Sequence, residues 1–307
     1  MENLDIKEFN ILVELEQNGE KASETEKVSE KTGLSVELVE STVEKLKKAG
    51  YIMYGENGCQ VTEEGYRYLE PYKVKRAVLM AAGFGSRMKP VTLTTPKPMV
   101  KVNGKVIIET LLDALVEKGI TDITIVTGYL NEKFEELKKK YPMVRTVYND
   151  RYSCENNISS AMHVKDLYSN AYVMDADLYL RNKDIVRRYE YASNYIGVWV
   201  DETDDWRFIM EDDHAVGMTR GGKDVYLMAG ISYWTKDAGE HFEKDIQELY
   251  QTEEGKQCYW DDVVLTKFNE HYDIKVRPCT ADDITEIDSI EELAQVDPSY
   301  KKYTVRA

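Results

Sequence analysis

The sequence predicts an α/β protein in which a doubly wound, mostly parallel sheet follows a small, mainly helical domain. Two observations carry this prediction. From Val74 onward, short apolar runs alternate with amphipathic segments, as strands and helices do in a doubly wound sheet. Before residue 71, apolar residues recur at helical spacing. A chain of 307 residues, 42% hydrophobic and 31% charged, is long enough for two such domains.

Composition and charge exclude several classes of function. The net charge of −16 repels polyanions and anionic membrane surfaces, which disfavours nucleic-acid and membrane partners. No apolar run approaches the roughly 18 to 20 residues of a membrane span, and the acidic start MENLDIKEFN is unlike a secretory signal. We therefore expect a cytoplasmic protein. Its four cysteines and four histidines lack zinc or disulfide spacing, so any metal is expected to bind oxygen ligands.

The first 71 residues are expected to form three helices and a hairpin. Apolar residues between Phe9 and Leu15 indicate the first helix, and residues 24–31 a short second one. Ser35 is the expected N-cap of a third helix that ends at Gly50. The runs YIMY and CQVT then flank two glycines, as the strands of a hairpin do. This order resembles a winged helix-turn-helix domain of the kind found in transcription regulators.

The charge of this N-terminal domain disfavours a DNA reader. A recognition helix in a major groove lies among phosphates, yet the third helix carries Glu37, Glu40 and Glu44. Residues 1–70 contain eight basic and sixteen acidic residues, a net charge of −8. We expect the domain to serve docking or self-association, with DNA reading as the alternative.

The second predicted domain, residues 74–307, follows the α/β pattern. Each expected strand is an apolar run and each expected helix is amphipathic. The strands are expected at 74–81, 122–128, 144–149 and 171–177, with helices at 107–118, 132–141 and 157–167 between them. Extended runs follow at 195–200, 214–220 and 225–234, then helices at 238–251 and 261–269, a strand at 271–279 and an acidic helix at 289–296.

The strongest chemical signal is the segment AAGFGSRM at 81–88, directly after a predicted buried strand. Its two glycines and small neighbours allow backbone N–H groups to approach phosphate oxygens. The spacing fits neither GxGxxG nor GxxxxGK[ST]. Arg87 supplies a forked cation, and Lys97, between two prolines, supplies a second. These features predict a nucleotide-phosphate site.

Two motifs, LMAAGFGSR and TPKPMV, carry a resemblance to the sugar-phosphate nucleotidyltransferases, whose signature is L-A-A-G-x-G-[ST]-R followed by a P-K-[PA] lysine. The resemblance covers residues 76–297. Later segments, among them NDRYSCENNISSA and CYWDDVV, are similar to those of bacterial CTP:phosphocholine cytidylyltransferases. The resemblance implies a Rossmann-like fold, the substrates CTP and phosphocholine, and Mg²⁺ as cofactor.

The resemblance also implies roles for single residues. Arg87 and Lys97 would be catalytic, and Asp177 and Asp288 would bind the magnesium ion. The nucleotide would be bound by Ala81, Ala82, Gly83, Phe84, Gly85, Ser86, Arg87, Tyr129, Asn156, Asn157 and Ser160.

The sequence itself supports the two aspartates. Asp177 ends a predicted parallel strand, and ligands of open α/β sheets bind at the carboxyl ends of strands. Magnesium usually takes one or two carboxylates together with phosphates, so Asp288 from elsewhere in the chain would suffice as partner. Two alternatives stay open: Asp175, on the same strand, competes for the metal role, and Asp288 is also placed to cap the last helix.

Aromatic residues suggest the second substrate. The candidates are Trp206, Tyr233, Trp234 and Trp260, with Asp261 as the neighbouring negative charge. A quaternary ammonium donates no N–H hydrogen bond and is held best by aromatic faces. Sugars also stack on aromatic rings, and each ring taken singly is equally suited to core packing.

We therefore expect a cytidylyltransferase that makes CDP-choline and pyrophosphate from CTP and phosphocholine. The alternative acceptors are phosphoethanolamine, 2-aminoethylphosphonate and a sugar 1-phosphate. A different class of function is a transcription regulator that uses a degenerate nucleotidyltransferase domain as a metabolite sensor. The presence of both cations and both aspartates favours the enzyme, whereas the oligomeric state stays open.

Overall fold

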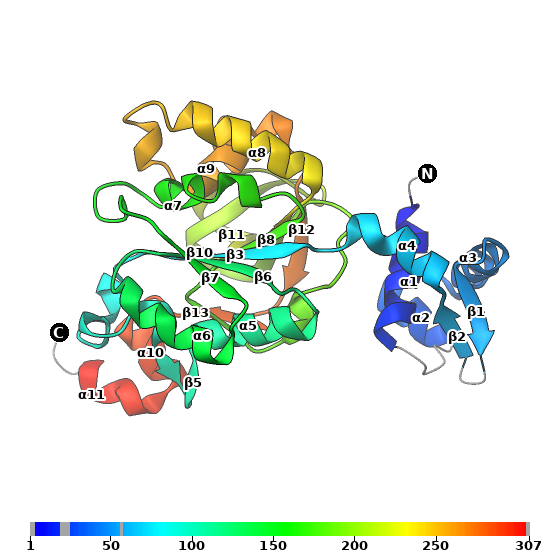
Figure 1. Cartoon of the computed structure of the whole chain (residues 1–307), viewed down its shortest axis with the longest axis horizontal. Coiled ribbons are helices and arrows are strands. Elements are labelled where there is room, and N and C mark those ends of the chain that lie inside the picture. Colours follow the sequence, from blue (N-terminus) through cyan, green and yellow to red (C-terminus); the bar gives the residue numbers. More distant parts are fainter. Residues whose placement is uncertain (1–3, 19–24, 56–57, 305–307) are drawn as a thin grey trace. The chain divides into compact units, whose positions relative to one another are not determined.

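The computed structural model describes residues 4–18, 25–55 and 58–304, which form two units (Figure 1). Unit 1 contains residues 1–73 and 189–191, and unit 2 contains residues 74–188 and 192–307. Glu24, the expected first residue of the second helix, lies outside the described residues. The predicted α/β fold class is confirmed.

Unit 1 is built from short helices and one hairpin. Its elements are α1 (Ile6–Asn18), α2 (Thr25–Thr32), α3 (Val36–Lys48), β1 (Ile52–Gly55), β2 (Gly58–Val61) and α4 (Glu63–Leu69). Ser35 caps α3 by accepting a hydrogen bond from the Leu38 backbone N–H. The core of the unit includes Tyr189, and the Tyr191 hydroxyl donates to the Leu4 carbonyl at 2.8 Å. The segment 189–191 therefore belongs to this unit, although it lies more than 100 residues beyond the predicted domain.

Unit 2 is organised around a seven-stranded sheet with the order β10-β12-β11-β8-β3-β6-β7. The strands are β3 (Arg76–Ala81), β6 (Asp122–Thr127), β7 (Val144–Tyr148), β8 (Ala171–Asp175), β10 (Asn194–Glu211), β11 (His214–Trp234) and β12 (Lys275–Cys279). The pairs β3–β6, β6–β7, β3–β8 and β10–β12 are parallel, whereas β11 runs antiparallel to its neighbours. The parallel part brings the carboxyl ends of β3 and β8 side by side.

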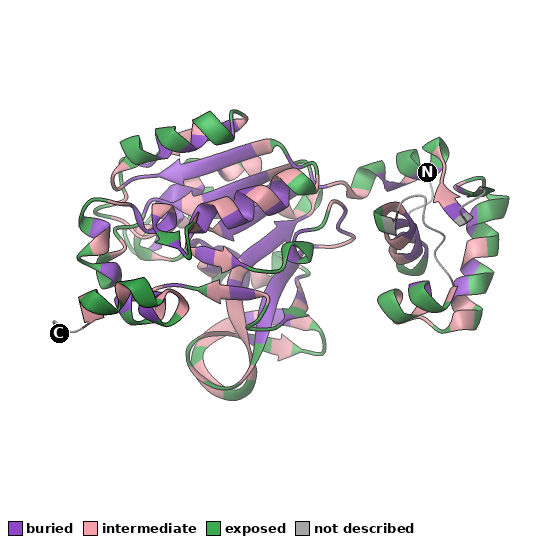
Figure 2. Ribbon diagram, turned by 90° about the horizontal axis from the view of Figure 1, so that it is seen from below, coloured by how far each residue is buried: buried purple, intermediate pink, exposed green. Residues whose placement is uncertain are grey.

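Helices cover both faces of this sheet (Figure 1). On one face lie α5 (Ile107–Glu117) and α6 (Leu137–Lys140), and on the other lie α7 (Ile158–Met162), α8 (Lys236–Leu249) and α9 (Trp260–Asp262). Buried residues follow the sheet strands, and exposed residues follow the outer sides of the helices (Figure 2). This three-layer arrangement buries the β strands from both sides, which explains their continuous apolar runs. No helix among the described residues is long and apolar enough to cross a bilayer.

Two small antiparallel ribbons complete unit 2. One joins β4 (Lys101–Val102) to β5 (Lys105–Val106), and the other joins β9 (Leu178–Leu180) to β13 (Ile284–Glu286). The last helices of the described residues are α10 (Ile290–Val296) and α11 (Lys301–Thr304). The ribbon β9–β13 was not predicted, because its strands have three residues each and lie about a hundred residues apart in the sequence.

Candidate active site

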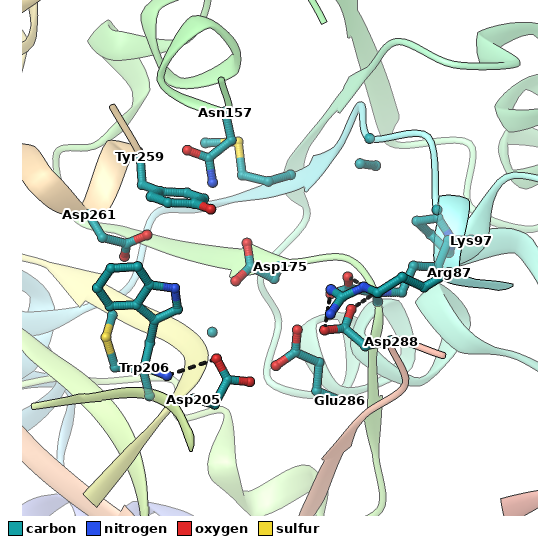
Figure 3. A pocket seen from close by; sticks show the side chains of 18 of the residues that line it. Arg87, Lys97, Asn157, Asp175, Asp205, Trp206, Tyr259, Asp261, Glu286 and Asp288 are labelled. Carbon is teal, nitrogen blue, oxygen red and sulfur yellow. Dashed lines mark hydrogen bonds and ion pairs between the residues drawn. The ribbon is translucent and has the colours of Figure 1, made fainter. Parts of the chain in front are cut away.

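A pocket of about 640 Å³ opens at the carboxyl ends of β3 and β8. Its wall combines a glycine loop, several carboxylates, a small group of aromatic side chains and three cations, Arg87, Lys97 and Arg220. Arg87, Lys97 and Asp288 lie at one end, Trp206, Tyr259 and Asp261 lie at the other, and Asp175 and Glu286 lie between them (Figure 3). The pocket thus has one end with Arg87, Lys97 and clustered carboxylates and another end with aromatic rings and further carboxylates.

The glycine loop after β3 lies against the base of Lys97. Gly85 has φ +60°, in the left-handed region that favours glycine. A Cβ atom at this position would lie 2.9 Å from the Cβ atom of Lys97, so a side chain would displace the lysine. The Thr92 hydroxyl donates to the Gly85 carbonyl at 2.8 Å and fixes the loop. Glycine is therefore required both for the turn and for the approach of Lys97.

Lys97 bridges the two predicted metal aspartates. Its ammonium donates to Asp177 Oδ2 at 2.5 Å and to Asp288 Oδ1, while Arg87 Nη2 lies 2.6 Å from Asp288 Oδ2. Burial lowers the pKa of Lys97, but attraction to the two carboxylates and their hydrogen bonds outweighs burial, and the pKa is raised. Lys97 is therefore a permanent cation and not a proton acceptor at working pH.

The carboxylates fit a hard divalent cation. Ligand atoms of Asp177, Glu286 and Asp288 lie within 4.8 Å of one another. In addition, Asp177 Oδ1 is buried and has no hydrogen-bond partner among the described residues. Carboxylate oxygens in a cluster of this size are the ligands that Mg²⁺ takes, so the residues present suit the ion.

Glu286 was missed by the sequence prediction. Burial raises its pKa well above the usual range, and the charges of Asp177 and Asp288 add to the effect. The sequence did contain a signal for Glu286, because this residue lies two positions before Asp288 in an extended segment. Alternation along a strand would have placed both side chains on one face.

Asp175 occupies the centre of the pocket. It is the last residue of β8, whereas Asp177 lies in the turn between β8 and β9. The expectation that Asp177 itself ends the strand is therefore wrong. Burial and the charges of Asp177 and Asp261 raise the pKa of Asp175 well above its usual range. A Cβ atom on Gly230 would lie 2.7 Å from Asp175 Oδ2, so this carboxylate also depends on a glycine neighbour.

The aromatic end is formed by Trp206 and Tyr259, whose rings meet edge to face with centroids 5.8 Å apart. Asp261 lies between them and accepts a hydrogen bond from the Tyr195 hydroxyl at 3.0 Å (Figure 3). Burial raises the pKa of Asp261 to about 7. Asp205 adds a second carboxylate beside Trp206 (Figure 3).

Three of the predicted aromatic residues do not line the pocket. Tyr233, Trp234 and Trp260 are at most 2% exposed and pack in the two cores that flank the sheet. Trp260 begins α9 with its ring among Tyr168, Phe242 and Trp234, so its neighbour Tyr259 faces the pocket instead. The prediction that all three contact a substrate is corrected accordingly, because their ring faces are covered by other side chains.

The predicted nucleotide residues divide into two groups. Those that line the pocket are Ala81, Gly83, Phe84, Gly85, Ser86, Arg87 and Asn157. The others lie behind or beside this wall. The Ala82 carbonyl accepts a hydrogen bond from the Tyr129 N–H at 3.1 Å, and the centroid of the Tyr129 ring lies 5.4 Å from that of Phe84. The Asn156 side chain donates a hydrogen bond to the Gln257 carbonyl. Ser160 is buried and accepts a hydrogen bond from the Asn149 side chain.

Comparison with known proteins identifies the family of the chain. Residues 76–205 match the nucleotidyl transferase family. The chain is 38% identical to the 2-aminoethylphosphonate cytidylyltransferase of Lancefieldella rimae, over 73% of this chain and 92% of the relative. It is 37% identical to the choline-phosphate cytidylyltransferase of Streptococcus pneumoniae, over 74% of this chain and 98% of the relative.

Solved structures show the same relationship. The fold matches the CTP:phosphocholine cytidylyltransferase of Streptococcus pneumoniae with a TM-score of 0.69 and 36% identity, over 74% of this chain and 99% of that chain. An inositol-1-phosphate CTP transferase from T. maritima, 15% identical, shares the fold with a TM-score of 0.59, over 76% of this chain and 96% of that chain. The chain is therefore a nucleotidyltransferase and belongs to the nucleotidyl transferase family.

Proposed function

We propose that this nucleotidyltransferase is a cytidylyltransferase that converts CTP and phosphocholine to CDP-choline and pyrophosphate. The observation that supports it is the pairing, in one pocket, of a phosphate-binding end with an aromatic and acidic end. Trp206 and Tyr259 offer aromatic rings to a trimethylammonium group, and Asp205 supplies negative charge close by. Arg220 lies over the Trp206 ring, 5.6 Å from its centroid, and would move aside for that group. The cytidylyltransferase relatives support CTP as the nucleotide.

The proposed chemistry is positioning and charge neutralisation. An oxygen of the acceptor phosphate attacks the α-phosphorus of CTP, and the bond from that phosphorus to the pyrophosphate oxygen breaks. Lys97, held at the floor of the pocket, neutralises charge between the two phosphates, while Arg87 steadies the departing pyrophosphate. The glycine loop orients the triphosphate through backbone N–H groups.

Mg²⁺ would be held by Asp177 and Asp288, with Glu286 beside them. When bound, it supplies positive charge that offsets the phosphate oxygens. Lys97 contacts the same two aspartates, which would hold its ammonium close to the acceptor phosphate and the α-phosphate of CTP.

A second acceptor, 2-aminoethylphosphonate, is favoured by a specific observation. Four carboxylates, those of Asp175, Asp205, Asp261 and Glu286, face the part of the pocket that would hold the cationic group (Figure 3). A primary ammonium donates hydrogen bonds to carboxylates, which a trimethylammonium group cannot do. The relative from Lancefieldella rimae is named as a cytidylyltransferase of this compound.

Pyrophosphate release over a matrix of substrates tests the proposal. Each of the four nucleoside triphosphates is combined with phosphocholine, phosphoethanolamine, 2-aminoethylphosphonate and glucose 1-phosphate. We expect the highest kcat/KM for CTP with phosphocholine. A higher value for 2-aminoethylphosphonate would replace the acceptor, and no release with any pair would refute an active transferase.

A further inference from the structure

A second cavity, of about 800 Å³, lies in unit 2 and shares no lining residue with the active-site pocket. Lys105, Arg181 and Lys183 line it, and no Asp or Glu among the described residues does. This charge is opposite to that of the whole chain, which has 56 acidic and 40 basic residues. Three cations around one hollow in an acidic protein attract an anion.

Two of the cations of this cavity, Arg181 and Lys183, are available to a ligand, whereas Lys105 forms an ion pair with the partly buried Asp113. Arg181 Nη1 donates to the Thr285 hydroxyl at 2.5 Å and to the Ala281 carbonyl at 3.4 Å, and neither acceptor carries a charge. Lys183 pairs with Glu117, but these side chains are 44% and 53% exposed, and ion pairs so exposed contribute little. A phosphate group can therefore replace the contacts of Arg181 and Lys183 without leaving a buried charge alone, and it can bind Lys105 while that lysine keeps Asp113 as a partner.

The ribbon β9–β13 separates this cavity from the active site. Thr285 lines the cavity, while the next residue, Glu286, lines the active-site pocket, because successive strand residues point to opposite faces. Tyr179, which pairs with Thr285, also lines the cavity. Two residues before Tyr179 is Asp177, whose carbonyl accepts from the Ile287 N–H at 3.4 Å. Within the ribbon, Tyr179 and Thr285 thus line the cavity and Glu286 lines the active-site pocket, while Asp177 and Asp288 lie just outside its two strands.

We propose that this second cavity is a regulatory site for a diphosphate-bearing small molecule. The forked guanidinium of Arg181 suits one phosphate, and the ammonium groups of Lys105 and Lys183 suit a second. A ligand that draws Arg181 away from Thr285 shifts the ribbon, and the carboxylates of Glu286 and Asp288 move with it. This inference does not depend on which acceptor the transferase uses.

Equilibrium dialysis with labelled pyrophosphate tests the binding site. We expect the wild-type chain to bind two pyrophosphates, one in each cavity. The double variant Arg181→Gln, Lys183→Gln should bind one, with at least tenfold weaker affinity at the lost site, and the double variant Arg87→Gln, Lys97→Met should bind the other one. Lys138→Gln, Lys139→Gln has the same loss of charge outside both cavities and should bind two. One pyrophosphate per wild-type chain, or two in the Arg181 variant, would overturn the proposal.

Kinetics test the regulation. At saturating CTP, where competition in the active site is overcome, the diphosphate analogue methylenediphosphonate should still change kcat by at least twofold in the wild type. The same analogue should leave kcat of the Arg181→Gln, Lys183→Gln variant unchanged, while the lysine control on α6 responds as the wild type does. An identical response in all three chains would show that the cavity has no influence on catalysis.

Discussion

Replacing Lys97 by Met removes one positive charge and keeps a side chain of similar length. The lysine side chain is 9% exposed and lies between Asp177 and Asp288, with Glu286 in the same cluster. Loss of one preorganised electrostatic contact to a transition state lowers kcat by on the order of 100- to 1000-fold, or about 2.7 to 4 kcal/mol. We expect a fall of this size in pyrophosphate release, with a smaller change in the KM of CTP.

The same substitution should make stability depend on magnesium. Without the ammonium, three clustered carboxylates repel one another, and breaking a buried ion pair destabilises a protein by about 3 to 5 kcal/mol. Because a divalent cation that binds only the folded chain stabilises it, Mg²⁺ should restore much of this loss. Chemical denaturation of Lys97→Met with EDTA and with Mg²⁺ measures the difference.

Lys101→Met is the matched control, because Lys101 is exposed and lies outside the pocket. It should keep wild-type kcat and wild-type dependence of stability on Mg²⁺. A change confined to KM in Lys97→Met would mean that the lysine only binds ground-state phosphate. Equal stability of Lys97→Met with EDTA and with Mg²⁺ would refute the argument from carboxylate repulsion.

Four further outcomes are expected. Asp288→Asn should abolish magnesium-dependent turnover in an intact fold, as judged by pyrophosphate release and circular dichroism, and near-normal turnover would refute its metal role. Trp206→Leu should raise the KM of phosphocholine about tenfold and leave the KM of CTP unchanged. Trp260→Leu should mainly lower the free energy of unfolding, by about 3 kcal/mol. Equal changes of the phosphocholine KM in both variants would contradict the placement of these rings. Burial raises the pKa of Asp261 from 3.8 to about 7, so the folded chain gains stability from this protonated group below pH 3.8 and loses it as pH rises toward 7. In urea titrations Asp261→Asn should therefore match the wild type near pH 4 and exceed it above pH 7 by on the order of 4 kcal/mol, and a difference independent of pH would exclude this titration. A chain that begins at Val74 retains every residue of the pocket wall and should retain turnover. The full chain should show no mobility shift with DNA at about 150 mM salt. Loss of turnover in a folded truncation would show that the N-terminal unit has a direct role in catalysis, and a sequence-specific DNA complex would show that it reads DNA.

Local patterns in the sequence predicted much of the end of the pocket that contains the glycine loop and the two cations Arg87 and Lys97. The loop that contains Gly85 follows a run of apolar residues, and its cation Arg87 lies two positions later. Both features depend on neighbours along the chain, so their spacing is readable without a structure. Lys97 was predicted in the same way, from its place between two prolines.

The aromatic end could not be predicted residue by residue. The sequence neighbours of three aromatic residues, Trp206, Tyr259 and Trp260, are similar in kind. What distinguishes these side chains is which other residues pack against them. The first two line the pocket, while the ring of Trp260 is covered by three other aromatic side chains. Burial of a ring is decided by tertiary contacts, which leave no periodic signal in a three-residue helix such as α9.

The sequence by itself determined the alternation of strands and helices, the glycine loop and the identity of the two cations, because these features arise from interactions between residues close along the chain. Only the tertiary structure decided that Asp177, Glu286 and Asp288 form one cluster and that Lys97 bridges it. The physical reason is the ribbon β9–β13, which joins segments about a hundred residues apart through a few backbone hydrogen bonds. Such long-range pairing depends on the packing of the whole unit and is not encoded in any short segment.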